Sequence, residues 1–339
     1  MNKNAIDVKR YVNVATWDFT LEVITPAFLG GSNSNAELRS ASFKGLLRYW
    51  WRVLYGAKYG DNILKKESEV FGTATGEKSG GVGKSNVQII ISPLRERKEF
   101  VNLIDDEKKY ISLTGKYINR LEYLTFGLDS NKRKALLNGT LLNLKLIVNK
   151  NYSTEVLQAF LFLCKYGGIG SKNRNGFGSL KIVKSSPVAT ISKDMLYVAP
   201  QVQSYSCLSK SSKLFYTKNA FNTWEDVMLE LADIYIDARS SLEKLHTFER
   251  RGLLARPIIS KKDKHNIPKE VYGGRHPKFL KMVVSKLKNG QYCGIILTLP
   301  IQFYESKNIR DYDGMVKDIH DFLSKKMIDK TNDLIGELQ

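Results

Sequence analysis

Cations at regular spacing are the residues of this sequence best suited to chemistry. Lys44, Arg48 and Arg52 follow one another at intervals of four, so they share one face of a predicted helix over residues 40–55. Arg39 comes directly before this helix, where free backbone N–H groups already favour anions. The pattern therefore predicts contact with an anionic partner. A solvated basic face on an amphipathic helix is the alternative reading.

A second group of cations lies in the stretch GGIGSKNRNGFGSLKI, residues 167–182. Lys172 and Arg174 stand there between two Gly-X-Gly units. Glycines adopt positive φ and permit close approach, so backbone N–H groups can point at phosphate oxygens. We expect an anion-binding loop, although a tight helix-to-strand connection remains an alternative. The glycines concerned are Gly168, Gly170, Gly176 and Gly178.

The overall charge favours a polyanionic partner. The 339 residues contain 53 Lys and Arg against 34 Asp and Glu, a formal net charge of +19. Nucleic acid and acidic membrane surfaces both attract such a chain. The longest apolar run, residues 294–301, is far short of the roughly 20 residues needed to cross a bilayer. The N-terminus has no signal-peptide pattern and the three cysteines are dispersed, so we expect a cytoplasmic location with no membrane contact.

Residues for catalysis are few. None of the four histidines has a Cys or His neighbour at metal-ligand spacing, so the sequence predicts no metal, no cofactor and no catalytic residue. The segment GVGKS, residues 81–85, lacks the first glycine of a phosphate-binding P-loop and precedes a strand rather than a helix. His276 follows Arg275 in a glycine-bearing segment and is suited to phosphate contact. A nuclease acting through His276 is the minority interpretation.

Aromatic residues are interleaved with the cations of the first helix. Some of them must form its buried face, since Phe43, Leu47 and Trp50 recur at helical spacing. We expect Trp51 and Tyr55 to be the exposed pair, available to stack on nucleic acid bases.

Hydrophobic periodicity predicts an α+β fold. The first half reads as strand, helix, strand, strand, helix, strand, which is the order of a ferredoxin-like domain. These elements span 17–25, 40–55, 86–91, 140–148, 153–167 and 179–184. The second half contains a predicted helix over 224–251, a hairpin formed by 279–287 and 292–300, and a helix over 311–326. We therefore predict domains at residues 14–186 and 195–330.

The glycine loop and the N-terminal stretch resemble a known family. GIGSKNRNGFG, residues 168–178, is similar to the GhGxxxxxGhG loop of the RAMP superfamily of CRISPR proteins, where h is an apolar residue. TPAFLGGSNSNAELRSASFKGLLRYWWRVLYG, residues 25–56, resembles more specifically the first-numbered RAMP subunits of type III-B (Cmr) effector complexes. The resemblance is close over the first domain and general over the second.

The resemblance implies two tandem ferredoxin-like domains, each an antiparallel sheet with helices on one face, the second without the glycine signature. It also implies a non-catalytic RNA-binding subunit of a crRNA-guided antiviral complex, placed toward the 3′ end of the guide. The partners would be crRNA, single-stranded target RNA and other RAMP subunits. The RNA-facing candidates are the glycines above with Arg39, Lys44, Arg48, Trp51, Arg52, Lys172 and Arg174, and in the second half Arg256, Arg275 and His276.

Two other functions stay open at this stage. One is a metal-independent endoribonuclease that processes the crRNA precursor, as some RAMP relatives do. The other is a scaffold whose basic face meets an acidic protein rather than RNA.

Overall fold

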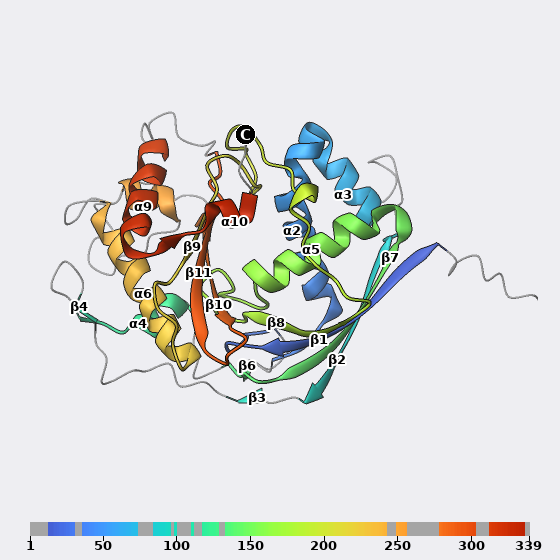
Figure 1. Ribbon diagram of the computed structural model, residues 1–339, viewed down its shortest axis with the longest axis horizontal. Helices are drawn as coiled ribbons and strands as arrows, with labels where there is room; N and C mark the ends of the chain where they lie inside the picture. The colour runs from blue at the N-terminus through green and yellow to red at the C-terminus, as the bar shows by residue number, and fades with distance from the viewer. Residues whose placement is uncertain are drawn as a thin grey trace, which may run out of the picture.

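Two four-stranded antiparallel sheets and the helices around them form the molecule (Figure 1). The computed structural model describes residues 13–30, 36–73, 84–95, 98–99, 110–111, 117–128, 133–242, 249–255, 278–302 and 312–335.

The first sheet has the strand order β2-β7-β1-β8. Its strands are β1 (Val14–Val23), β2 (Val87–Arg95), β7 (Leu141–Asn149) and β8 (Leu180–Ser186). Helix α2 (Ser40–Tyr59) lies between β1 and β2 in the chain, and α5 (Ser153–Tyr166) between β7 and β8. The six predicted elements are confirmed, in the strand order of a ferredoxin-like sheet. Helix α3 (Ile63–Phe71), which follows α2, was not predicted.

Alternating side chains fix the inner face of the first sheet. Leu142, Leu144 and Leu146 of β7 are buried, and Leu144 pairs with the buried Phe19 of β1. Since successive side chains point to opposite faces, this register turns one apolar set toward the helices. Helices α2 and α5 cover that face, where the rings of Trp50 and Phe162 lie 6.2 Å apart.

The second sheet repeats the same order of elements. Its strand order is β10-β11-β9-β12. The strands are β9 (Lys213–Tyr216), β10 (Leu280–Lys286), β11 (Tyr292–Thr298) and β12 (Ile328–Asp329). Helix α6 (Trp224–Ser241) lies between β9 and β10, and α9 (Tyr312–Lys326) between β11 and β12. The chain is therefore α+β with two ferredoxin-like units, as predicted.

The sequence placed the hairpin β10–β11 and helix α9 correctly, but it missed both short strands. The predicted helix over 224–251 was too long, because α6 ends at Ser241 and α7 (Glu249–Leu254) is a separate element. Strands β9 and β12, of four and two residues, are too short to show a period of their own.

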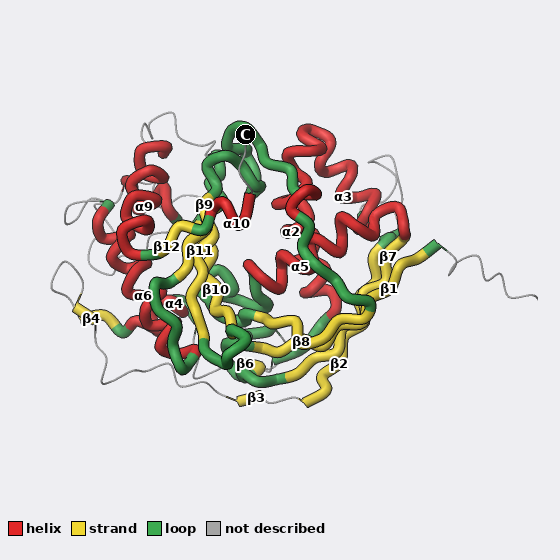
Figure 2. Tube along the Cα trace, in the orientation of Figure 1, coloured by secondary structure: helices red, strands yellow, loops and turns green. Residues whose placement is uncertain are grey.

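Both faces of the second sheet are covered. Met282 and Val284 of β10 belong to a core with α6 and α9, whereas Val283, between them, belongs to the core built on α2 and α5. Figures 1 and 2 show α6 and α9 on one side of this sheet and α2, α5 and α10 (Thr331–Ile335) on the other. Strand β10 thus separates the two cores.

Short elements complete the described fold. They are β3 (Lys98–Glu99), β4 (Tyr110–Ile111), β5 (Tyr117–Ile118), β6 (Ala135–Leu136) and α4 (Arg120–Thr125), with 3-10 turns at Gly60–Asn62, Lys150–Tyr152 and Lys193–Met195. Of the helices in the described ranges, none combines the length and the hydropathy of a membrane span.

Candidate nucleic-acid interface

The three cations of helix α2 lie on one half-exposed face, which we call the α2 stripe: Lys44, Arg48 and Arg52. The structure gives two of them an acidic neighbour, because Glu67 of α3 lies 3.7 Å from Arg48 and 3.3 Å from Arg52. The Oε2 atom of Glu67, which forms the ion pair with Arg52, is buried and makes no hydrogen bond. Burial, and then the charge of Arg48, lower the pKa of Lys44.

Arg48 also has a structural task. Its Nη2 donates to the carbonyl of Phe71, the last residue of α3, at 2.9 Å and to that of the C-cap residue Gly72. A cation at this end of a helix satisfies free carbonyls and opposes the helix dipole. At the N-terminus of α2, the N-cap residue Arg39 donates to the Gly30 carbonyl at 2.9 Å and forms an ion pair with Glu37 at 3.0 Å.

The glycine loop, residues 167–179, lies directly against the segment that follows β1. The N–H of Ser171 donates to the Phe28 carbonyl at 2.9 Å, and the N–H of Gly178 donates to that of Pro26 at 3.0 Å. The hydroxyl of Thr25 donates to the Gly176 carbonyl at 2.7 Å and accepts the Ser179 N–H at 3.0 Å. The two sequence motifs that carry the family resemblance therefore pair with each other.

The four signature glycines are packed against protein atoms. A Cβ at Gly178 would lie 2.0 Å from the Ile169 carbonyl oxygen, and one at Gly170 would lie 2.6 Å from that of Phe28. A Cβ at Gly176 would meet the sulfur of Met228 in α6 at 2.5 Å, and one at Gly168 would meet the Gly178 carbonyl at 2.9 Å. The expectation that these glycines leave room for a ligand is therefore corrected, because the chain itself fills that room.

The loop also joins the second sheet. Asn175 forms a parallel bridge with Met282 of β10, whose N–H donates to the Arg174 carbonyl at 3.1 Å. The Ser179 hydroxyl accepts the N–H of Val284 at 3.0 Å. These bonds hold the loop between β10 and the first sheet.

Arg174 brings the loop to helix α2. Its guanidinium carbon lies 5.8 Å from the ring centroid of Tyr49, the residue next to Arg48. Burial raises the pKa of the Tyr49 phenol, while the charges of Arg174 and Arg52 act against that rise. The charges of Arg174, from the loop, and of Arg52, from the α2 stripe, therefore both act on the Tyr49 phenol.

Lys172, at the tip of the loop, is held in place by its backbone and by its side chain. It is a non-glycine residue with φ of 65°, in the left-handed region. Its Nζ donates to the Phe126 carbonyl at 2.7 Å, and burial lowers its pKa.

Two lysines that sequence reasoning missed lie beside Arg174. The Nζ of Lys281, in β10, is 4.3 Å from the ring centroid of Tyr49. The Nζ of Lys278 is 4.0 Å from that of Tyr235 in α6 and has no hydrogen-bond partner. Burial, followed by the charge of Arg174, lowers the pKa of both lysines well below the ordinary value. We call Lys172, Arg174, Lys278 and Lys281 the junction cluster. The sequence does contain a sign of this buried lysine, since Lys281 interrupts the otherwise apolar run FLKMVV, residues 279–284.

Trp51 and Tyr55 are buried, which overturns the expectation that they stack on bases. Trp51 is 0% exposed, and its indole N–H donates to a carboxylate oxygen of Glu155 at 3.0 Å. The other oxygen of Glu155 accepts from Lys58 at 2.6 Å and from the Tyr59 hydroxyl at 2.7 Å. This network joins α2 to α5, so the aromatic run in α2 serves packing.

Three predicted contacts of the second half, Arg256, Arg275 and His276, lie outside the described residues. The buried His320, in α9, is described. Its Nε2 lies 2.9 Å from the Thr298 hydroxyl, and burial lowers its pKa to about 4. Across the ranges that the structure describes, no group of three His, Cys, Asp or Glu residues is arranged to hold a metal ion.

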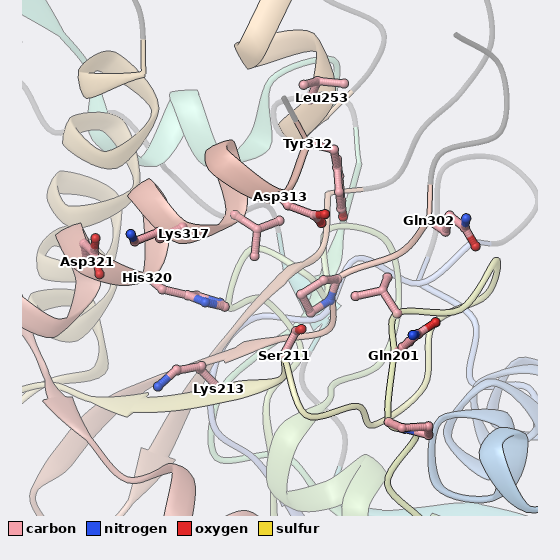
Figure 3. Close-up of a pocket in the computed structure, with 14 residues that line it drawn as sticks. Gln201, Ser211, Lys213, Leu253, Gln302, Tyr312, Asp313, Lys317, His320 and Asp321 are labelled. Carbon is pink, nitrogen blue, oxygen red and sulfur yellow. The ribbon is translucent and has the colours of Figure 1, made fainter. Parts of the chain in front are cut away.

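His320 lines a cavity of about 720 Å³ between α9 and the segments beside β9 and β11. Figure 3 shows Lys317, His320 and Asp321 along one side of it and Gln201 on the opposite side. Its lysines are balanced by acids, since Lys213 pairs with Asp329 at 3.4 Å and Asp321 also lines the wall. This cavity therefore lacks the excess positive charge of the junction cluster.

About half of the chain is similar in sequence to known proteins. Residues 20–181 match the RAMP superfamily. CRISPR system Cmr subunit Cmr1-2 of Pyrococcus furiosus is 27% identical over 179 residues, covering 48% of this chain and 93% of that protein. Cmr subunit Cmr1-1 of the same organism is 33% identical over 181 residues, covering 50% of this chain and 48% of that protein.

Structural comparison extends the similarity of fold to nearly the whole chain. A crystal structure of Cmr1 from Pyrococcus furiosus in its apo form matches with a TM-score of 0.60 and 18% identity, covering 93% of this chain and 98% of the other. A chain in a cryo-EM structure of the type III-B Cmr-beta complex bound to cognate target RNA matches with a TM-score of 0.55 and 12% identity, covering 91% and 99%. At these identities the likeness shows the fold.

Proposed function

We propose that the chain, whose residues 20–181 match the RAMP superfamily, is a non-catalytic RNA-binding subunit of a type III-B CRISPR effector complex. It contacts guide crRNA toward the 3′ end, target RNA, or both, and takes part in antiviral defence. Its protein partners are the other RAMP subunits of the complex. Its two domains are residues 14–186 and 195–330.

One observation carries the RNA-binding part of this proposal. Arg174 of the glycine loop lies against Tyr49 of α2, and the charges of Arg174 and of Arg52 in the α2 stripe both act on the phenol of that tyrosine. A phosphate backbone is the polyanion that such a surface attracts, and the net charge of +19 acts in the same direction. The similarity to Cmr1 subunits, and to a chain of a complex described as bound to target RNA, supports RNA as that polyanion.

The mechanism needs little sequence reading by this chain. Phosphate contacts fix the register of a strand and carry no base information. Phe43, Trp50, Trp51 and Tyr55 of α2 are buried, so we expect charge rather than base stacking to dominate the contact. Guide–target pairing then selects the sequence, as in other RNA-guided systems.

The proposal is tested by fluorescence anisotropy of the purified chain with labelled single-stranded RNA across a salt series. We expect the logarithm of the association constant to fall linearly with the logarithm of the salt concentration. The slope should be about −0.7 for each phosphate contacted. The same RNA annealed to its complement serves as a competitor, to separate the strand from the duplex. A chain that binds no RNA at low salt, alone or with the other Cmr subunits, would refute the RNA-binding proposal.

A further inference from the structure

The junction cluster gathers four cations that have no acidic partner among the residues that the structure describes. Within the described part of the chain, no carboxylate forms an ion pair with Lys172, Arg174, Lys278 or Lys281. Lys278 is 9% exposed and Lys281 is 6% exposed. The strongest charges acting on Lys278 are all positive, from Arg174, Arg239, Lys281 and Lys172.

Such an arrangement opposes folding. Removing an ammonium group from water is unfavourable unless an opposite charge is close, and neighbouring cations add repulsion. The rings of Tyr235 and Tyr49, 4.0 and 4.3 Å from the two Nζ atoms, offset only part of this cost. An apolar residue of similar size would pack at either position without that cost. The lysines are therefore better explained by a ligand than by stability.

The cluster also draws on both halves of the chain. Lys172 and Arg174 come from the glycine loop, Lys278 lies two residues before β10, and Lys281 lies in that strand. The hydrogen bond from the Met282 N–H to the Arg174 carbonyl fixes these two segments side by side. The cations are thus positioned before any ligand arrives, which lowers the entropy that binding would otherwise cost.

We propose that the junction cluster binds one phosphate group of the RNA, with Arg174, Lys278 and Lys281 as its ligands. This inference rests on the proposed RNA-binding function and adds a defined site to it. Arg174 supplies the planar fork that matches two phosphate oxygens, and the lysines act as point charges beside it. The unpartnered Nζ of Lys278 gains an acceptor when the phosphate is present.

The site predicts an opposition between stability and binding that a structural lysine would not show. Lys278→Met and Lys281→Met keep the side-chain length and remove the charge. We expect both variants to raise the melting temperature of the RNA-free chain. We also expect each to weaken single-stranded RNA binding by about tenfold and to reduce the salt slope by about 0.7.

Lys286→Met is the matched control. Lys286 ends the same strand, but its Nζ lies 2.6 Å from a carboxylate oxygen of Glu22. Its replacement should lower the melting temperature and leave RNA affinity unchanged. If Lys278→Met and Lys281→Met behave in this same way while wild type binds RNA, the phosphate site is refuted and the proposed function stands.

The phosphate can belong to the interior of a strand or to its end, and two oligonucleotides of one sequence separate these sources. One ends in a 3′-hydroxyl and the other in a 3′-phosphate. Weakening of both by Lys278→Met supports an internal phosphodiester, and weakening of the phosphate-ended strand alone supports a terminal group. Equal affinity of wild type and variant for both strands overturns the site.

The site has a test that does not need RNA binding. Inorganic phosphate is compared with chloride at equal ionic strength, and the melting temperature is measured. A rise in wild type that is absent from Lys278→Met supports the site even if the chain binds no RNA and the proposed function fails. Equal rises in the melting temperatures of wild type and Lys278→Met would refute the phosphate site.

Discussion

The guanidinium of Arg174 lies over the ring of Tyr49, with its central carbon 5.8 Å from the ring centroid. Arg174 belongs to the glycine loop and Tyr49 to helix α2, more than 100 residues earlier in the sequence. This contact joins the glycine loop to helix α2, and the Nζ of Lys281 lies 4.3 Å from the centroid of the same ring.

Arg174→Ala should weaken single-stranded RNA binding by about 1–2 kcal/mol and reduce the salt slope by about 0.7. The fold should survive, because the Arg174 bond to β10 is made by its backbone carbonyl, which the substitution keeps. Anisotropy across a salt series measures both quantities. Lys184→Ala, at an exposed lysine of β8, is the control for loss of one positive charge. An equal loss of affinity in both variants would argue for diffuse attraction rather than a site.

Gly178→Ala should destabilise the chain far more than Gly139→Ala. Both glycines have positive φ, 69° and 75°, so both substitutions carry a backbone cost of about 1 kcal/mol. At Gly178 the new Cβ would also lie 2.0 Å from the Ile169 carbonyl oxygen, while Gly139 faces open space. Urea denaturation gives the two free energies of unfolding. Similar values for both variants would mean that the Gly178 contact relaxes easily.

Glu67→Gln should strengthen RNA binding at low salt. The carboxylate lies between Arg48 and Arg52, at 3.7 and 3.3 Å, and competes with phosphate for their charge. The amide keeps the shape and removes the competing charge, so we expect an affinity gain of about two- to tenfold that disappears at high salt. A binding curve at two salt concentrations checks this. Unchanged or weaker binding at low salt would exclude Arg48 and Arg52 from the contact.

RNA binding should take up protons. Burial first, and then the charge of Arg174, lower the pKa of Lys278 and Lys281 in the free chain. A bound phosphate reverses this and raises both values. In the pH range between the lowered and the ordinary pKa, each lysine is neutral when free and charged when bound, so affinity falls as the pH rises. The groups facing the two lysines are Tyr235 and Arg239 of α6, Tyr49 and Trp50 of α2, and Lys172 and Arg174 of the loop.

Titration calorimetry measures this uptake. At one pH, the observed binding enthalpy in two buffers of different ionisation enthalpy should differ in proportion to the protons taken up. The double variant Lys278→Met with Lys281→Met should lose most of the difference. Identical enthalpies for wild type in both buffers would contradict the linkage.

Periodicity was sufficient for the longer elements. The alternation in β7 and the apolar stripe of α2 predict which residues are buried. Each pattern is local, and its spacing matches the side-chain period of a strand or of a helix. The exposed partners were harder to assign. Trp51 follows Trp50 directly and was expected to face solvent, yet both are buried, since α3 and α5 pack on two sides of α2.

The α+β order, the family motifs and the excess of positive charge can be read from the chain, because these depend on composition and on spacing within single segments. The packing around the glycines and the grouping of the cations depend on contacts between segments far apart in the chain. Gly178 and Ile169 lie nine residues apart, and Arg174 and Lys278 over one hundred. Whether such residues come near each other depends on how β8, β10 and α2 pack together, and no local period records that packing.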